Sequence, residues 1–230
     1  MIQNMRDLGG LKTQDGKTIK PHCLIRSAHL YQARENDLDG IASIIDLRTP
    51  GERGQAPDQT WHCEYLPLPV FTEEEAGISH EQEISEQLIP DMAMLYGRLI
   101  RECTASLRKI ILTIMTHDYS SGAILWHCTE GKDRCGLTTA LILETLDVDR
   151  KIIMEDYLKT NMVNLPKAVR IHDRLLRTQG KSMAEAAYQA YIADERYFQA
   201  AWDAMGEDYI HGKLGIDEET VSRFKTDVLE

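Results

Sequence analysis

The sequence predicts an α/β fold, with a central sheet flanked by helices and a helical C-terminal half. Three observations carry this prediction. The first third holds short apolar runs separated by turn residues, which is typical of strands. From Asp91 onward, apolar residues recur at the spacing of a helix. No internal repeat and no linker rich in proline or glycine divides the chain, so we expect one domain over residues 1–230.

We expect four strands in the sheet. Each is a short run rich in apolar and β-branched residues, and they cover residues 23–26, 41–47, 65–70 and 123–126. The fourth differs from the others, because a polar stretch at 127–134 follows it directly and an apolar run at 137–146 comes next. A strand, a loop and a helix therefore follow one another at this point of the chain.

The first predicted helix begins near Asp91. Its apolar residues form one stripe at the helical period: Met92, Leu95, Tyr96, Leu99 and Ile100. Beyond the helix at 137–146, further helical segments cover residues 151–159, 166–178, 183–192 and 196–205. The last helix has a recognisable start, because Asp217 can cap it and Ile216 can pack against Val221.

The chain is acidic, with a net charge of -11 at pH 7. This charge argues against a general nucleic-acid binder, since affinity for the phosphate backbone comes from clustered lysine and arginine. Residues 71–91 alone contribute seven acidic side chains and no lysine or arginine. We expect a solvated acidic loop or helix face there, rather than a lid or a partner site.

Hydropathy and cysteine content indicate a compartment. The mean hydropathy is -0.36, and no apolar run approaches the ~20 residues of a transmembrane helix, so we expect no transmembrane segment. The five cysteines include no C-x-x-C pair and are too sparse for a disulfide framework. The first ten residues lack the apolar stretch of a secretory signal. We therefore expect a cytoplasmic protein.

The residues that indicate chemistry are 128–134, hereafter the anion loop. Cys128 ends a predicted strand, and Arg134 follows six positions later, where a helix is expected to begin. None of the other four cysteines has arginine at this spacing. A loop of this size between a strand and a helix can turn successive N–H groups inward and hold an oxyanion. The residues expected to bind phosphate in this way are Thr129, Glu130, Gly131, Lys132, Asp133 and Arg134.

The same arrangement would make Cys128 a nucleophile. The N–H groups and the helix dipole that hold a phosphate also stabilise the cysteine sulfur as an anion. Arg134 can hold two phosphoryl oxygens at once through its planar guanidinium. A covalent phosphocysteine needs a proton donor beside the leaving oxygen, and Asp133 is the nearest candidate. We expect His127 to orient the loop by hydrogen bonding rather than to act as the base.

Two other readings of this segment fail on spacing. A nucleotide-binding P-loop would need glycine five positions before Gly131 and a hydroxyl residue after Lys132, where Trp126 and Asp133 stand. A zinc site would need converging ligands, but His127, Cys128 and the nearby Cys135 lack ligand spacing. We therefore expect no metal and no cofactor.

The run from His127 to Gly136, read as HC-x-x-GKDR-x-G, resembles the loop of the atypical bacterial tyrosine and dual-specificity phosphatases, some of which hydrolyse phosphoinositides. Weaker similarities to this family lie at residues 4–10, 26–30, 46–52 and 156–161. The resemblance implies a protein-tyrosine-phosphatase-like fold, Cys128 as nucleophile and Arg134 as phosphate ligand. It also implies Asp133 as general acid, with Asp46 as a competing candidate.

The other similar segments supply candidates for support of the loop. We expect Asp46, Arg48 and Glu52 to form a buried ion-pair cluster beneath it. We expect Arg6, together with Asp7, and Arg26 to connect the N-terminal segment to the core.

Three positions in the loop motif bear on rate and substrate. Such phosphatases usually carry threonine or serine after the arginine, whereas Cys135 offers only a weak S–H donor to the nucleophilic sulfur. We therefore predict slowed hydrolysis of the phosphocysteine. As for the thiol itself, we expect a small residue tolerated at the helix start rather than a resolving thiol that forms a disulfide with oxidised Cys128. Glu130 is acidic where small or apolar residues are common, so it would repel highly anionic substrates. Lys132 would act in the opposite sense, as a second cation favouring phosphoinositides, unless it pairs with a neighbouring carboxylate.

The function predicted is a cysteine-dependent phosphomonoesterase acting through a phosphocysteine intermediate. Phosphotyrosine in proteins is the first expected substrate class, and phosphoinositides or inositol phosphates are the alternative. A rhodanese-like sulfurtransferase also keeps a cysteine in an anion loop, but its chemistry needs no general acid such as Asp133. A phospho-ligand-binding pseudophosphatase is the remaining alternative, although the loop retains every essential group.

Overall fold

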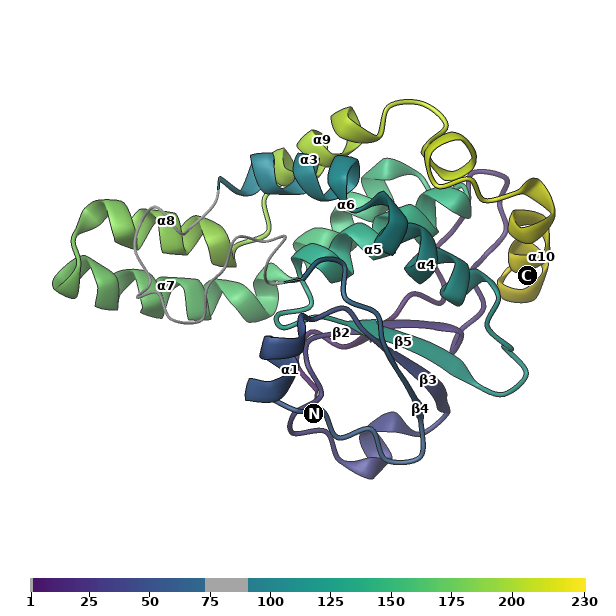
Figure 1. Cartoon of the computed structure of the whole chain (residues 1–230), viewed down its shortest axis with the longest axis horizontal. Helices are drawn as coiled ribbons and strands as arrows, with labels where there is room; N and C mark the ends of the chain where they lie inside the picture. Colours follow the sequence, from purple (N-terminus) through teal and green to yellow (C-terminus); the bar gives the residue numbers. More distant parts are fainter. Residues whose placement is uncertain (1, 73–90) are drawn as a thin grey trace.

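A five-stranded sheet forms the centre of the molecule. The computed structural model describes residues 2–72 and 91–230 (Figure 1). The strands are β1 (Arg6–Asp7), β2 (Leu24–Ser27), β3 (Ile41–Asp46), β4 (Glu64–Pro67) and β5 (Ala123–His127). Their order in the sheet is β1-β2-β5-β3-β4. The four predicted strands are thus confirmed to within a few residues, whereas β1 is only two residues long and its sequence carries no strand signal.

The central strands are parallel, and only β1 is antiparallel to its neighbour. Alternate residues of each central strand face two different apolar clusters. On β5, Ile124 and Trp126 belong to the larger cluster beneath the helices, whereas Leu125 belongs to a smaller cluster on the opposite face. Because β5 is buried on both faces, its first four residues are all apolar rather than alternating.

The helices follow the predicted pattern with three differences. Their bounds are α1 (Pro50–Gln55), α3 (Met92–Glu102), α4 (Thr104–Met115), α5 (Asp133–Thr145), α6 (Arg150–Leu158), α7 (Asn161–Thr178), α8 (Lys181–Tyr191), α9 (Glu195–Met205) and α10 (Glu218–Val228). Short helical turns lie at Glu35–Leu38 and Tyr209–Lys213. The short helix α1 was not predicted, and α4 was not resolved as a helix separate from α3.

The predicted start of α7 at Pro166 is wrong, because the helix begins five residues earlier, at Asn161. A proline inside a helix leaves the carbonyl four residues before it without an N–H partner. That carbonyl belongs to Met162, whose side chain is exposed, so water can reach this turn of the helix. The predicted cap of α10 is confirmed, since the Asp217 side chain accepts a hydrogen bond from the Thr220 N–H.

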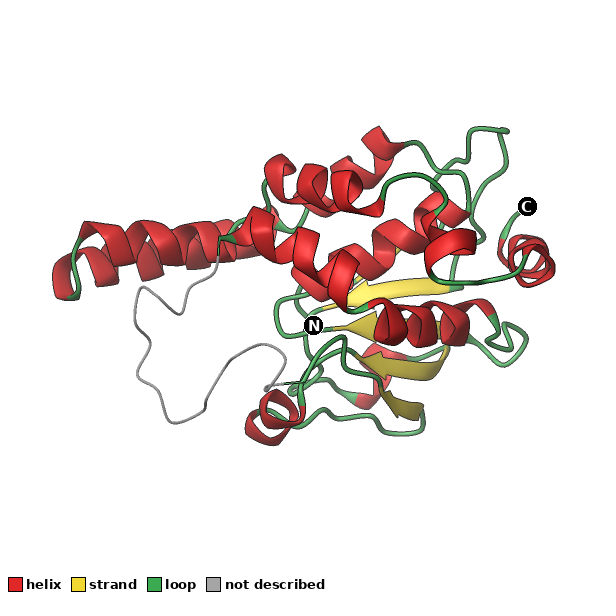
Figure 2. Cartoon of the chain, turned by 45° about the horizontal axis from the view of Figure 1, so that its top comes forward, coloured by secondary structure: helices red, strands yellow, loops and turns green. Residues whose placement is uncertain are grey.

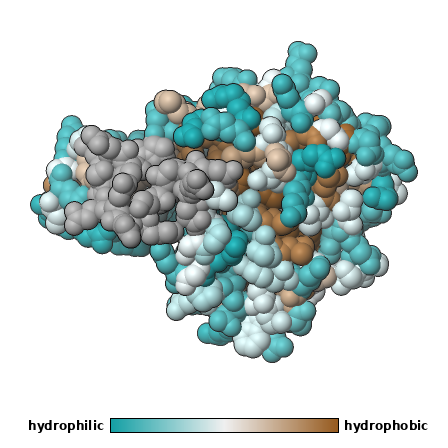
Figure 3. All heavy atoms as spheres, in the orientation of Figure 1, coloured by the Kyte–Doolittle hydropathy of each residue, from teal (hydrophilic) through white to brown (hydrophobic). Residues whose placement is uncertain are grey.

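Helices α7 and α8 form an antiparallel pair, hereafter the arm, that extends beyond the rest of the molecule (Figures 1 and 2). In the body, apolar residues gather in the middle of the face shown in Figure 3, with hydrophilic residues around its rim. No helix in the described part of the chain is long and apolar enough to cross a bilayer. Most of the predicted acidic segment, residues 73–90, lies outside the described residues.

Candidate active site

The anion loop begins at the carboxyl edge of the sheet. Here β2, β5 and β3 end side by side, with His127 in register with Ser27 on one side and Asp46 on the other. The carboxyl ends of parallel strands are where open α/β sheets bind ligands. Cys128 follows β5 directly and is 2% exposed, and residues 129–132 connect it to the first turn of α5.

Gly131 allows the loop to turn. Its φ is +67°, and a Cβ atom at this position would lie 2.6 Å from the carbonyl oxygen of Ser27. Both the left-handed conformation and the close approach of another backbone require glycine. The loop therefore packs tightly against the end of β2.

The carbonyl groups of the loop are bound from outside. Asn4 Nδ2 donates to the carbonyls of Glu130 and Gly131, at 3.0 Å each, and Arg26 Nη2 donates to that of Gly131 at 2.8 Å. The carbonyl of Thr129 accepts from a backbone N–H of the segment after β2. With these carbonyls held outward, the N–H groups of the loop are free to converge on an anion at the positive end of α5.

Arg26 belongs to a buried ion-pair network behind the loop. Asp156 of α6 accepts from Arg26 Nη1 at 2.7 Å and from Arg6 Nε at 2.7 Å. Burial opposes ionisation of Asp156, but the two arginines outweigh it and hold the pKa of its carboxyl below the usual value. Arg6 and Arg26 thus connect the N-terminal segment to the core as predicted, through Asp156 rather than Asp7.

Glu52 holds Arg134 through two hydrogen bonds. Arg134 Nη1 and Nη2 donate to the two carboxylate oxygens at 2.5 and 2.7 Å, and Thr129 Oγ1 donates to Oε1 at 2.5 Å. Burial disfavours the charged form of Glu52, but these donors prevail and lower its pKa to about 2. Glu52 therefore stays ionised and fixes the guanidinium beside the loop.

The local sequence explains the position and direction of the Glu52 side chain. It is the third residue of α1, and it forms a capping box with Thr49: the Thr49 hydroxyl accepts from the Glu52 N–H, and the Glu52 carboxylate accepts from the Thr49 N–H. We expected Glu52 in one cluster with Asp46 and Arg48. The structure separates them, because the capping box directs the Glu52 side chain toward Arg134.

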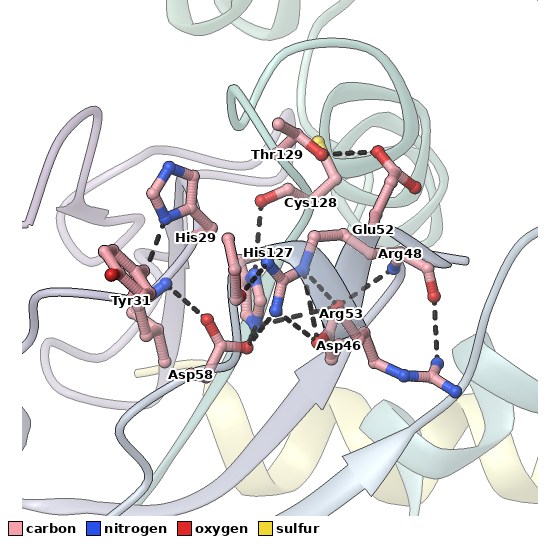
Figure 4. Close-up of polar contacts among 12 residues, drawn as sticks. His29, Tyr31, Asp46, Arg48, Glu52, Arg53, Asp58, His127, Cys128 and Thr129 are labelled. Atoms are coloured by element: carbon pink, nitrogen blue, oxygen red, sulfur yellow. Dashed lines mark hydrogen bonds and ion pairs between the residues drawn. The ribbon is translucent and has the colours of Figure 1, made fainter. Parts of the chain in front are cut away.

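A second buried cluster lies beneath the loop (Figure 4). Arg48 donates to Asp46 at 2.8 Å and to Asp58 at 2.6 Å, and His127 Nε2 lies 3.1 Å from Asp58 without the alignment of a hydrogen bond. His127 Nδ1 lies 3.2 Å from the carbonyl oxygen of Cys128. The imidazole ring of His127 thus lies between Asp58 and the backbone of Cys128.

Asp46, the competing candidate for the general acid, lies in this cluster. It is fully buried, and Arg48 and Tyr65 both donate to it. Burial alone would favour its neutral form, but Arg48, His127 and Tyr65 hold the pKa of Asp46 well below its usual range. Asp46, Asp58 and His127 lie close enough to share a metal ion, yet Arg48 bonds both carboxylates and supplies the positive charge itself.

Asp133, the other candidate acid, lies at the start of α5 with its side chain 27% exposed. Tyr96 of α3 donates a hydrogen bond to Asp133 Oδ1 at 2.8 Å, and the Tyr96 and Tyr157 hydroxyls are also 2.8 Å apart. Because the one proton of Tyr96 goes to the carboxylate, Tyr157 donates to Tyr96. Sequence reasoning treated Tyr96 only as part of an apolar stripe, and nothing in the local pattern indicates its contact with Asp133.

The side chain of Lys132 does not lie at the mouth of the loop. It is 1% exposed, and its Nζ donates to the carbonyls of Ala190 and Ile192 at 2.5 and 3.0 Å and lies 3.2 Å from Asp133 Oδ1. The expectation that it supplies a second cation for phosphoinositides is therefore wrong, and the alternative of a pair with a neighbouring carboxylate is observed. Only its backbone N–H remains a phosphate-ligand candidate.

The side chains of Glu130 and Cys135 also have partners elsewhere in the protein. The Glu130 carboxylate pairs with Lys167 of α7. The Cys135 thiol, in the first turn of α5, is fully buried, and its Sγ donates to the carbonyl oxygen of Trp126 at 3.7 Å. Burial raises the pKa of Cys135 to about 11, which disfavours a thiolate that could resolve an oxidised partner.

The comparisons with known proteins agree with this geometry. A relative in Mycobacterium tuberculosis, named triple specificity protein phosphatase PtpB, is 27% identical over 96% of this chain and 95% of its own. A protein of Cupriavidus necator, named provisionally as a tyrosine-protein phosphatase, is 26% identical over 94% of this chain and 83% of its own. The sequence model described as the tyrosine phosphatase family matches residues 1–230. The chain therefore belongs to the tyrosine phosphatase family.

Proposed function

We propose that this cysteine-based phosphatase uses Cys128 as its nucleophile and hydrolyses phosphotyrosine in proteins. The observation that carries the proposal is the position of Cys128 at the base of a loop whose carbonyls are held outward and whose Arg134 is fixed by Glu52. Donors held in advance around an oxyanion favour the transition state of phosphoryl transfer.

The reaction has two steps. The Cys128 thiolate attacks phosphorus and forms an S–P bond, while the P–O bond to the leaving group breaks and Asp133 gives its proton to the leaving oxygen. In the second step water attacks phosphorus and gives a proton to Asp133, the S–P bond breaks, and inorganic phosphate leaves with Cys128 again a thiolate. Arg134 and the loop N–H groups bind the phosphoryl oxygens throughout. Tyr96 positions the Asp133 carboxyl.

The proposed substrate class follows from the charged side chains around the anion loop. With Lys132 turned toward α8, and Glu130 paired with Lys167, the described residues supply no second free cation at the loop. This supports a single phosphate, as on tyrosine, over a multiply phosphorylated headgroup. The relative named as a triple specificity phosphatase supports a test over three classes of substrate. All five thiols are free, which supports a reducing compartment such as the cytoplasm.

The test is phosphate release from a phosphotyrosine peptide, a phosphoserine peptide and a short-chain phosphoinositide, in the presence of EDTA. We expect turnover to be fastest on phosphotyrosine and to fall to background in Cys128→Ser. Cys23→Ser, which changes a thiol far from the loop, is the matched control and should keep full activity. Turnover that survives in Cys128→Ser, or that is fastest on the phosphoinositide, would contradict the proposal.

The acid is tested separately. The proposed role of Asp133 predicts that Asp133→Asn flattens the limb of the rate profile on which activity falls as pH rises. Asp46→Asn should keep that limb, although its stability should fall, because it leaves Arg48 with one buried carboxylate fewer. If Asp46→Asn flattens the limb and Asp133→Asn does not, the assignment is reversed.

A further inference from the structure

The exposed apolar side chains of this protein gather on one helix. The described residues include seven large apolar side chains that are well exposed, and four of them lie on α7. Met162 is 82% exposed, Leu165 40%, Val169 44% and Leu176 46%. Single exposed apolar residues are ordinary, but a group of them on one element marks an interaction surface.

These four residues lie on the same side of α7. Their spacings of three, four and seven residues return each to nearly the same angle on a helix. The adjoining side of α7, about 110° round the helix, packs against α8 and buries Asn164 and Ala168. The helix therefore has one face that serves the fold and a second apolar face, hereafter the α7 stripe, that faces solvent.

Basic residues border the α7 stripe. Arg170 and Arg177 directly follow Val169 and Leu176, so they lie beside one edge of it, whereas Arg174 lies about 150° round the helix from its centre. All three are exposed, and none has an ion-pair partner within residues 2–72 and 91–230. The helix carries a net charge of +3, whereas the whole chain carries -11. This local reversal of charge is unexpected on a solvated face without a partner.

We propose that the α7 stripe docks on the surface of an anionic phospholipid membrane. An apolar face inserts among the acyl chains near the headgroups, while the arginines beside it bind the lipid phosphates. The partner follows from the chemistry of the face. The apolar residues need a non-aqueous phase, and the arginines, which have no ion-pair partner among the described residues, need anions next to it. The proposal does not depend on the reaction assigned to Cys128.

The arm is also joined to the anion loop, so a docked arm would hold the loop near the membrane. Lys167 of α7 pairs with Glu130. Lys132 bonds the carbonyls of Ala190 and Ile192 at the end of α8. These contacts fix the base of the arm and leave its outer turns extended from the body (Figure 1).

The experiment is cosedimentation of the full-length protein with vesicles of phosphatidylcholine, alone or with about 30 mol% phosphatidylglycerol. We expect binding to the anionic vesicles alone and weaker binding as NaCl rises from about 0.1 to about 0.5 M. Replacing the three arginines by glutamine should weaken binding on the order of 100-fold. The matched control, Lys12→Gln, Lys213→Gln and Arg223→Gln, removes the same charge elsewhere and should bind within about threefold of wild type.

The apolar contribution has its own pair of variants. Leu165→Gln with Val169→Gln should weaken binding by about tenfold or more, because both side chains would leave the acyl region. Met94→Gln with Tyr31→Gln changes two exposed apolar residues outside α7 and should leave binding unchanged. Each variant is checked by its activity on a small soluble phosphate ester, which should equal that of wild type.

Three results would overturn the proposal. The first is no binding to anionic vesicles, and the second is binding that the arginine variant retains. The third is a concentration-dependent dimer, seen by sedimentation velocity and lost in Leu165→Gln with Val169→Gln, without vesicle binding. That third result would place a second copy of this chain on the α7 stripe instead of a membrane.

Discussion

The anion loop and the arm use their charged residues in opposite ways. Around the loop, arginines lie in the interior and each meets carboxylates: Arg26 with Asp156, and Arg48 with both Asp46 and Asp58. On the arm, by contrast, arginines are exposed without such partners among the described residues, and α7 buries only Asn164 and Ala168. The loop is thus held in one geometry before substrate arrives, whereas the arm keeps its side chains available to a surface outside the molecule.

The largest expected effect comes from breaking the network behind the loop. Asp156→Ala leaves Arg6 and Arg26 facing each other without a carboxylate, and it should lower the free energy of unfolding by about 3–5 kcal/mol. The expected fall in melting temperature is about 6–20 °C for a chain of this size. Glu144→Ala removes an exposed ion pair with Arg150 and should cost less than about 1 kcal/mol. If the two variants lose similar free energy of unfolding, the buried pairs behind the loop do not differ from exposed pairs in their effect on stability.

Glu52→Gln tests the front of the loop. It removes the carboxylate that holds Arg134 at both nitrogens, and we expect kcat/KM to fall by about 10- to 100-fold. Because the pKa of Glu52 is lowered from 4.5 to about 2, its ionisation stabilises the fold above pH 4.5, and this stabilisation is lost as pH falls toward about 2.

The measurement is denaturant unfolding of wild type and Glu52→Gln across that pH range. The difference in stability between them should shrink as the solution becomes more acidic. Glu102→Gln, on an exposed pair with Arg98, is the control. A difference that stays constant down to about pH 2 would show that Glu52 does not carry the charge we assign to it.

Lys132→Met tests the contact between the two regions. Methionine has an unbranched side chain of similar length, but it lacks the Nζ donor to the carbonyls of Ala190 and Ile192. Leaving these acceptors unbound should cost about 1–3 kcal/mol. Hydrogen exchange should become faster at the end of α8 and stay unchanged in β5. Equal acceleration in both would mean that the arm and the loop unfold as one unit.

Tyr96→Phe is expected to have a smaller effect, specific to the acid. The Tyr96 hydroxyl holds the Asp133 carboxyl in place, so without it kcat should fall by about two- to tenfold with KM nearly unchanged. Tyr119→Phe removes a hydroxyl bonded to the Ile114 carbonyl and should leave kcat unchanged. A loss of stability in Tyr96→Phe without any fall in kcat would limit Tyr96 to packing.

The smallest effect is expected on the outer turns of the arm. Leu176→Gln changes an exposed side chain, so the free energy of unfolding should change by less than about 0.5 kcal/mol. Leu141→Ala, at a fully buried position of α5, should cost about 2–5 kcal/mol. Both are measured by denaturant unfolding. A cost for Leu176→Gln comparable with that of Leu141→Ala would show that the α7 stripe is already covered within the chain.

Sequence patterns predicted the elements and the loop because these depend on neighbours along the chain. The period of the apolar residues located α3, and the spacing of Cys128 and Arg134 located the chemistry. Pro166 misled the prediction of α7, since a helix can continue past a proline where water reaches the freed carbonyl. The capping box of Thr49 and Glu52 was readable in the sequence and would have indicated α1.

The sequence by itself determined the family, the fold class and the motif that holds Cys128, Asp133 and Arg134. Only the tertiary structure decided the partners of the charged groups: Glu52 for Arg134, Asp156 for Arg26, and the end of α8 for Lys132. The physical reason is range. Strand and helix signals arise over a few residues, whereas an ion pair or a buried donor depends on which distant segments packing brings within about 3 Å.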